Sequence, residues 1–458
     1  MKKISIECAG SGKTYGIAMK IKDCYETCPK HKKIYAITFT NNAVENISRE
    51  IIKQIGFLPD NVVLQTIHTF MLERVIYPFS KFILNKNIIS CSIDKLPEDY
   101  ALKNHYKTQM LKEGILHSQF VMNYGKRIIC PTGSDTKKIL KRKDIVLNHI
   151  INGIETLYID EIQDMDDDFF KIIDYLANTK LNMYLVGDFR QALKYPKSLL
   201  NFLAANKIFE ISQNNVTRRV PEKHLFFANQ LFSSNYASTN HKNFQGDIIY
   251  SYEDEQNIDQ LMNCYNLHFI DESNEKFTTH NTNDSSLWFT KNEKEEMCGN
   301  FKGDNNILAK VIIRILKKRY EIKKDAKYVV KNFFKKDLSS SLYAKLTKML
   351  SDSPQQRHVT NSIEKIKGLE GDKCLFFVSY NMLNILMGNN KRNKETNKLY
   401  VALTRSKKVL HLVILDECTQ KMSKNVIEKF MQENNVIHLS LIIVACIIHK
   451  YLNKVKRF

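Results

Sequence analysis

The stretch LYIDEIQD, residues 157–164, decides how the rest of this sequence is interpreted. Its first three residues are apolar, which is typical of a buried strand in a parallel sheet, and acidic residues follow at once. A carboxylate that ends such a strand lies at the carboxyl edge of the sheet, where open α/β folds bind ligands. There Asp160 can hold a Mg²⁺ ion and Glu161 can polarise a water molecule. Asp164 and the acidic run 166–168 are also explained as helix N-caps.

A phosphate-binding loop is predicted near the N-terminus, where residues 4–14 read ISIECAGSGKT. Gly10 and Gly12 let backbone N–H groups curl around a phosphate, and the helix is expected to begin near Thr14. Lys13 then reaches the β- and γ-phosphates while the Thr14 hydroxyl binds Mg²⁺. Glu7 replaces the first glycine of the usual G-x-x-x-x-G-K-[ST] pattern. The residues expected to contact the nucleotide here are Ala9, Gly10, Ser11, Gly12, Lys13 and Thr14.

The chain has 458 residues, enough for two to four domains, and a formal net charge of +20. This excess indicates a polyanionic partner, and nucleic acid is the first candidate. A basic bias spread over solvated lysines would give the same net charge, so charge alone only favours a nucleic-acid partner.

The ten cysteines are scattered, and none forms a CxxC pair with zinc-ligand spacing. Scattered cysteines are typical of a reduced protein, so a cytoplasmic location is expected. The N-terminus runs directly into the predicted strand, unlike a signal peptide. Residues 439–448 are almost wholly apolar but too few to cross a bilayer. We expect a buried terminal helix there rather than a membrane-associated tail, and no membrane partner.

Two further strands end in aromatic and hydrogen-bonding residues. Residues 34–43 form one strand and its loop, an amphipathic helix is predicted at 44–55, and residues 62–70 form the next strand and loop. Phe39 and Phe70 would ordinarily be assigned to the core. Here each lies just past a strand among small polar residues, which suits a shelf where bases stack while hydroxyls and amides bind phosphates.

Four motifs now stand in order: AGSGKT at 9–14, TFTNNA at 38–43, TIHTF at 66–70 and DEIQD at 160–164. This series resembles the UvrD/Rep-like group of superfamily 1 DNA helicases. The resemblance implies an α/β fold with two RecA-like P-loop NTPase lobes, each a parallel sheet flanked by helices, and small inserted subdomains. It also implies ATP and Mg²⁺ bound between the lobes and single-stranded DNA held across them.

Downstream motifs extend the resemblance to about residue 415. GDFRQ at 187–191 is similar to motif III, whose glutamine, Gln191, senses the γ-phosphate; Tyr195 is a nearby aromatic that could stack on a base. In TRRVP at 217–221, Arg219 matches the family arginine better than Arg218 does. KGLE at 367–370 resembles motif V, although Glu364 stands where relatives commonly carry histidine.

Residues 398–408, KLYVALTRSKK, are close to motif VI, and Arg405 is the candidate for neutralising charge on the transferred phosphate. The resemblance thus implies a set of roles. The catalytic residues are Lys13, Asp160, Glu161, Gln191, Arg219 and Arg405. Gly368 and Glu370 join the phosphate loop in binding nucleotide, and Thr14 and Asp160 hold the metal. The DNA-binding residues are Thr38, Phe39, Asn41, Thr66, His68 and Tyr195.

The motifs also divide the chain. Residues 1–74 and 151–210 form the first lobe, and the basic segment 75–150 is an inserted subdomain. Residues 211–435 form the second lobe with a reduced insertion, and residues 436–458 form an apolar and basic tail. Strand and helix signals alternate over 244–345, including strands near 246–250 and 286–290.

Taken together, the motifs predict an ATP-dependent single-stranded DNA translocase or helicase, 3′ to 5′ by resemblance, acting on 3′-tailed duplex. An ATP-switched helicase-like subunit of a bacterial anti-phage system, acting with a partner nuclease, is the alternative. A nucleic-acid scaffold with an inactive ATPase is disfavoured because every catalytic part is present. RNA stays open as a substrate, as does GTP, because the family's adenine-reading glutamine upstream of the loop has no counterpart in this sequence.

Overall fold

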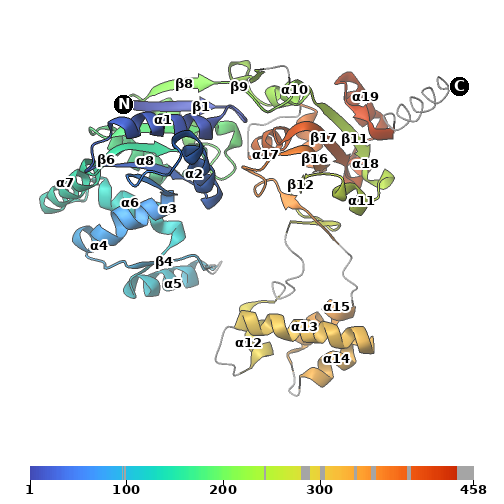
Figure 1. Cartoon of the computed structure of the whole chain (residues 1–458). Coiled ribbons are helices and arrows are strands. Elements are labelled where there is room, and N and C mark those ends of the chain that lie inside the picture. Colours follow the sequence, from blue (N-terminus) through green and yellow to red (C-terminus); the bar gives the residue numbers. More distant parts are fainter. Residues whose placement is uncertain are drawn as a thin grey trace.

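The computed structural model describes residues 1–94, 96, 99–241, 244–279, 289–299, 305–334, 338–351, 357–388 and 394–440. Two lobes, each built on a six-stranded parallel sheet flanked by helices, lie side by side (Figure 1). This arrangement confirms the predicted α/β fold with two lobes, each a parallel sheet flanked by helices.

The first sheet has the strand order β3-β2-β6-β7-β1-β8, and every neighbouring pair is parallel. Strand β6 carries the stretch that opens the sequence analysis, and its last four residues are buried. Its neighbours β1, β2 and β7 are buried on both faces in the same way, as all-parallel sheets require. The strands are β1 (Lys2–Glu7), β2 (Lys33–Thr38), β3 (Val62–Thr66), β6 (Ile154–Ile159), β7 (Asn182–Gly187) and β8 (Glu210–Asn214).

Helices cover both faces of this sheet, and each face has its own apolar core. Helix α2 shows how the sequence sets the boundaries: the Thr40 hydroxyl accepts from the Ala43 N–H at its start, and Gly56, at φ 94°, ends it. The helices are α1 (Lys13–Thr27), α2 (Asn41–Ile55), α3 (Ile67–Met71), α4 (Tyr77–Leu84), α6 (Val121–Ile129), α7 (Lys137–Asn152), α8 (Asp167–Ala177) and α9 (Ser198–Ala205).

Much of segment 75–150 packs into the first lobe. Helices α4, α6 and α7 contribute Ile83, Ile128 and Val146 to the lobe's core. A smaller part projects from it: β4 (Ser90–Ser92) pairs with β5 (Ile115–His117), and α5 (Tyr100–Lys112) joins them without burying any residue.

The second sheet, with order β15-β12-β16-β17-β11-β18, is also parallel throughout. The last five residues of each of its two central strands are buried and contribute to the core of this lobe, with helices on both sides. The strands are β11 (Asp247–Tyr252), β12 (Leu267–Ile270), β15 (Asn361–Ser362), β16 (Gly371–Val378), β17 (Ser406–Ile414) and β18 (Ile437–His438). The helices are α10 (Glu222–Gln230), α11 (Ile258–Asn263), α16 (Tyr380–Leu386), α17 (Lys394–Leu403), α18 (Asp416–Lys421) and α19 (Lys424–Glu433).

A four-helix insertion stands apart from both sheets (Figure 1). It comprises α12 (Lys291–Cys298), α13 (Asn305–Lys323), α14 (Ala326–Phe333) and α15 (Ser340–Ser351), which share an apolar core of their own. At its base, β13 (Phe277–Thr278) pairs with β14 (His358–Val359).

The strand predicted near 246–250 is confirmed as β11, and strands and a helix alternate up to β13. The predicted alternation does not extend into the described part of the insertion, which is helical from residue 291. In α13 the buried residues Ala309, Ile312, Ile313 and Leu316 recur at helical spacing, and this period overrides the strand preference of isoleucine. The strand signal at 286–290 lies largely outside the described residues, as does most of the apolar tail. Among the described helices, none has the length and apolar character needed to cross a membrane.

Candidate nucleotide and nucleic-acid site

The phosphate loop follows β1 and leads directly into α1. Gly10 and Gly12 have φ values of 74° and 95°, a left-handed conformation that glycine adopts without strain. Gly12 is the N-cap of α1, so no side-chain oxygen occupies the N–H groups of the first turn. The Lys13 ammonium lies back over the loop, 3.4 Å from the Glu7 carbonyl oxygen and 3.3 Å from that of Cys8.

Glu7, the residue that departs from the loop pattern, is held by hydroxyl groups. Its carboxylate accepts hydrogen bonds from Ser5 at 2.9 Å and from Ser11 at 3.0 Å, and the side chain is buried. Because both carboxylate oxygens are engaged within the loop, Glu7 acts as an internal brace of the loop.

The acidic end of β6 points into the interior. Asp160 is buried, and its Oδ1 accepts from the Glu161 N–H at 2.9 Å. Burial and the neighbouring Glu161 raise the pKa of Asp160. Glu161 has a φ of 55°, which is uncommon for a residue with a side chain.

A buried carboxylate that lacks a strong cation partner fits a hard metal ion such as Mg²⁺. Asp160 and the half-buried Thr14 hydroxyl are the oxygen ligands that the loop and strand supply. The described residues contain no group of three or more His, Cys, Asp or Glu side chains placed to hold a metal. A metal here would therefore share its coordination with phosphate oxygens and water.

Lys367 of the second lobe reaches into this acidic cluster. Its ammonium pairs with the Asp164 carboxylate and lies 3.4 Å from Glu161 Oε2. Burial alone would raise the pKa of Glu161, but Lys367 and Lys13 outweigh it and the pKa is lowered. Sequence reasoning quoted Lys367 within motif V without giving it a role. The Asp164 carboxylate therefore pairs with Lys367, whereas Asp166 is the N-cap of α8.

The loop after β7 forms a second buried cluster. Asp188 Oδ1 accepts from Arg190 Nε at 2.6 Å, and Oδ2 accepts from Gln191 Nε2 at 3.0 Å. The Asp188 N–H donates to Gln163 Oε1 at 3.0 Å, which ties this loop to the end of β6. Gln191 therefore lies at the same sheet edge as Glu161, but its amide is engaged by Asp188.

Two arginines of the expected set lie next to the loop. Arg405 is 2% exposed, and its partners among the described residues are the carbonyl oxygens of Val401 and Leu369 and the Thr404 hydroxyl, at 3.1–3.3 Å. Burial, followed by the nearby Arg219, lowers the pKa of Arg405 to about 9. Arg219 Nη1 donates to Glu370 Oε2 at 2.8 Å. Glu370 also pairs with Lys407, so this predicted nucleotide ligand orients Arg219.

The segment that joins the lobes, between β8 and α10, passes over the phosphate loop. The Arg218 N–H donates to the Gly10 carbonyl oxygen at 2.8 Å. A Cβ atom added to Gly10 would lie 2.7 Å from both Arg219 Cβ and Thr217 Oγ1. Glycine is therefore required at position 10 by packing as well as by φ.

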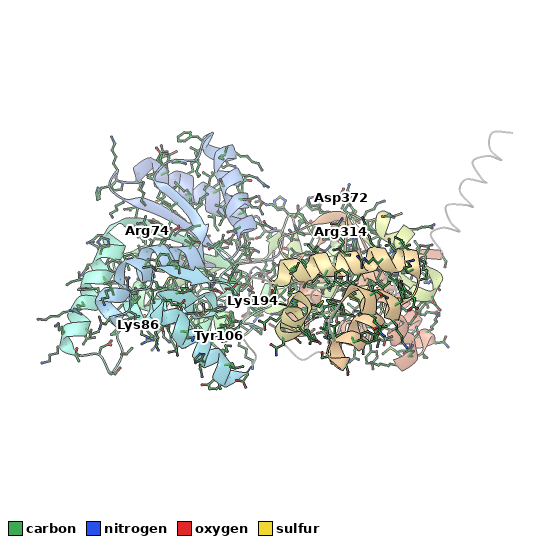
Figure 2. All side chains as sticks on the ribbon, turned by 90° about the horizontal axis from the view of Figure 1, so that it is seen from below. Arg74, Lys86, Tyr106, Lys194, Arg314 and Asp372 are labelled. Carbon is green, nitrogen blue, oxygen red and sulfur yellow. The ribbon has the colours of Figure 1, made fainter. Side chains whose placement is uncertain are left out.

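The expected nucleic-acid shelf is built at the ends of β2, β3 and β7. Phe39 is half-buried, with the His68 ring edge-on at 6.1 Å and the Lys194 ammonium 4.0 Å from its centre. Lys194 lies on the side of the first lobe that faces the rest of the molecule (Figure 2). Sequence reasoning noted Lys194 only as a neighbour of Tyr195, which is 42% exposed.

The remaining shelf residues differ in access. Asn41 is exposed at the start of α2, and the Thr66 hydroxyl caps α3. Thr38 is fully buried, and its hydroxyl has no hydrogen-bond partner within the part of the chain that the structure describes. In this conformation Thr38 offers no surface, whereas Phe39, Asn41 and Tyr195 do.

The comparisons with known proteins place part of this chain. Residues 4–196 match a family model described as an AAA domain. A 195-residue segment is 27% identical to Gabija protein GajB of Bacillus cereus (strain VD045), covering 40% of this chain. The match covers 36% of that relative, so the chain corresponds to only about a third of its length.

Solved structures of the arterivirus helicase nonstructural protein 10, alone and in complex with DNA, are similar over most of the chain. Both have a TM-score of 0.36 and 9% sequence identity; they cover 92% and 91% of this chain, and the chain covers 62% of each. Similarity at this level adds nothing to the fold described above.

Proposed function

We propose that this chain is an ATP-driven translocase and helicase on single-stranded DNA, moving 3′ to 5′. The supporting observation is a buried charged cluster built from both lobes. Lys13, Asp160 and Glu161 come from the first lobe, and Lys367 and Arg405 come from the second. A site divided in this way is complete only when the lobes are apposed, which couples catalysis to lobe movement.

Each residue then has a role set by its position. The loop N–H groups and Lys13 bind the phosphates of ATP, and the metal supplies charge neutralisation for them. Glu161 orients the attacking water after the ion pair between Glu161 and Lys367 has opened. Arg405, a buried cation whose described contacts include no carboxylate, stabilises charge on the phosphate being transferred.

The nucleic-acid end of the proposal rests on charge and on the shelf. The net charge of +20 favours a polyanion, and Phe39, flanked by His68 and Lys194, offers one ring face for stacking. Backbone contacts make the grip independent of sequence and sensitive to salt.

The test is ATP hydrolysis by the purified chain with and without single-stranded DNA. Lys13→Ala and Glu161→Gln should each abolish DNA-stimulated turnover without unfolding the protein. Glu155→Gln is the matched control. Glu155 lies near the start of β6, the strand that leads to Glu161, and its carboxylate pairs with Lys32. Unchanged turnover in the first two variants would contradict the assignment. Unwinding of 3′-tailed but not 5′-tailed duplex tests the direction.

A second function is favoured by the similarity to Gabija protein GajB. In it, the same ATP site acts as a switch in a subunit that works with a partner nuclease in anti-phage defence. The two proposals differ in what the isolated chain does: a helicase unwinds tailed duplex alone, whereas a switch subunit hydrolyses ATP without unwinding.

A further inference from the structure

One tyrosine of the second lobe is buried inside the first lobe's nucleotide site. Tyr400, on α17, is 1% exposed. Its ring packs edge-on to Phe232 at 5.5 Å, and the Arg190 guanidinium lies 5.3 Å from the ring centre. Sequence reasoning gave this residue no role.

The Tyr400 hydroxyl is bonded to two separate loops of the first lobe. It accepts from the Ala9 N–H of the phosphate loop at 3.3 Å and donates to Asp188 Oδ2 at 3.2 Å. Burial, followed by the adjacent Asp188, raises the pKa of Tyr400, so the phenol keeps the proton that it donates. The phenol therefore bridges the phosphate loop and the loop after β7.

The acceptor in the second loop is shared. Asp188 Oδ2 accepts from Tyr400 and also from Gln191 Nε2, at 3.0 Å, whereas Oδ1 is taken by Arg190. Asp188 is fully buried, so an oxygen that loses both donors would find no solvent to replace them. Gln191 can leave Asp188 at low cost only while Tyr400 stays.

The position of α17 is fixed against the same loop. Asn397, one turn before Tyr400, donates to the carbonyl oxygens of Phe189 and Ala192 at 3.3 and 2.8 Å. These two residues flank Arg190 and Gln191. The helix is thus attached to both ends of the segment that carries Gln191, and the chain leads from it directly to Arg405.

We propose that Tyr400 is a positioning residue that releases Gln191 from Asp188 toward the nucleotide and reports lobe closure to the phosphate loop through the Ala9 N–H. The role of Gln191 in this inference rests on the proposed ATP hydrolysis. Tyr400 acts through Asp188 and Ala9 and contacts no reacting atom.

The first experiment compares ATP turnover in Tyr400→Phe, Gln191→Ala and the double variant. Tyr400→Phe should lower kcat about tenfold, the size of a lost hydrogen bond to a charged group, with a smaller change in KM. Because Tyr400 works through Gln191, the double variant should be about as slow as the slower single variant. An unchanged kcat, or losses that multiply, would overturn the inference.

The second experiment does not depend on turnover. Hydrogen exchange is measured by mass spectrometry on peptides covering residues 5–14 in nucleotide-free protein. Tyr400→Phe should speed exchange at the phosphate loop, because the Ala9 N–H loses its acceptor. Tyr265→Phe is the matched control, since its hydroxyl bonds to His411 inside the second lobe at 2.7 Å. Equal loop exchange in Tyr400→Phe and wild type would refute the coupling, whereas absent ATPase in the wild type would refute only the proposed function.

Discussion

Arg405 is a buried positive charge without a carboxylate among its described partners. Its guanidinium is desolvated, and its described partners are two carbonyl oxygens and one hydroxyl. Burial, followed by the nearby Arg219, lowers its pKa to about 9. Carbonyl dipoles compensate a full charge less well than a carboxylate does. An anion bound next to Arg405 would compensate the positive charge of its guanidinium.

Arg405→Lys should lower kcat for ATP hydrolysis at least ~100-fold while nucleotide affinity changes little. Lysine keeps the charge but cannot present the planar guanidinium fork to a phosphate. Stopped-flow binding of a fluorescent ATP analogue and steady-state turnover separate the two effects. Loss of affinity with normal kcat would assign Arg405 to ground-state binding instead.

Sequence reasoning located the residues that follow strands in fixed patterns, such as Lys13, Asp160 and Glu161, because local order alone places them at a sheet edge. It gave no role to Lys367 or Tyr400. Their partners, Asp164 and Asp188, lie 203 and 212 residues away, and nothing in the local pattern of a lysine or tyrosine announces such a contact.

At the scale of elements, strand β17 carries a buried histidine. His411 accepts or donates at both ring nitrogens, to the Ser251 hydroxyl at 2.9 Å and the Tyr265 hydroxyl at 2.7 Å. Burial, followed by the nearby His438, lowers the pKa of His411 to about 4. The fold therefore holds this imidazole neutral.

The pH dependence of stability follows from that shift. Between pH ~6.5 and ~4 the unfolded state binds a proton that the folded state refuses, so stability is present above this window and is lost as pH falls through it. The melting temperature should drop by about 2–4 °C between pH 7 and 5. Calorimetry of His411→Gln should give a flatter pH profile; an identical slope would rule out His411 as the cause.

The four-helix insertion is an element with its own core, and its ends are held together by β13 and β14. Replacing residues 289–351 with a short Gly-Ser linker should leave both sheets folded and DNA-independent ATP turnover within about twofold of wild type, because neither lobe's core includes its side chains. Circular dichroism and turnover check this. A collapse of solubility would show that the insertion supports the lobes.

The element predictions succeeded where burial and spacing agree, as in β1, β2, β6 and β11. The predicted alternation of strand and helix does not extend into the insertion, where the helical spacing of buried positions prevails. The sequence alone does not show whether a segment has a neighbouring strand to pair with. It therefore cannot decide between strand preference and helical spacing.

At the scale of the whole molecule, the lobes meet through buried polar contacts beside apolar packing, in which Ala9 and Leu193 of the first lobe join the core of the second. Lys367, Asn397 and Tyr400 all bridge the two halves. Such contacts are specific in geometry, and breaking one leaves the partner group buried without its bond.

Lys367→Met should lower the free energy of unfolding by about 3–5 kcal/mol, since two buried carboxylates lose their counter-ion. Lys3→Met, which removes an exposed pair with Glu210, should cost less than about 1 kcal/mol and serves as the control. Urea denaturation measures both. Equal small losses would indicate that the lobes do not depend on this pair.

The backbone hydrogen bond from Arg218 to Gly10 joins the cradle for the nucleotide to the chain that connects the lobes. A change in the phosphate loop at Gly10 therefore also affects the segment that connects the lobes. If the proposed function holds, a small molecule that separated Gly10 from Thr217 would disturb nucleotide binding and the connection between the lobes together. Escape by substitution would be narrow, because any side chain at position 10 collides with the connecting chain itself.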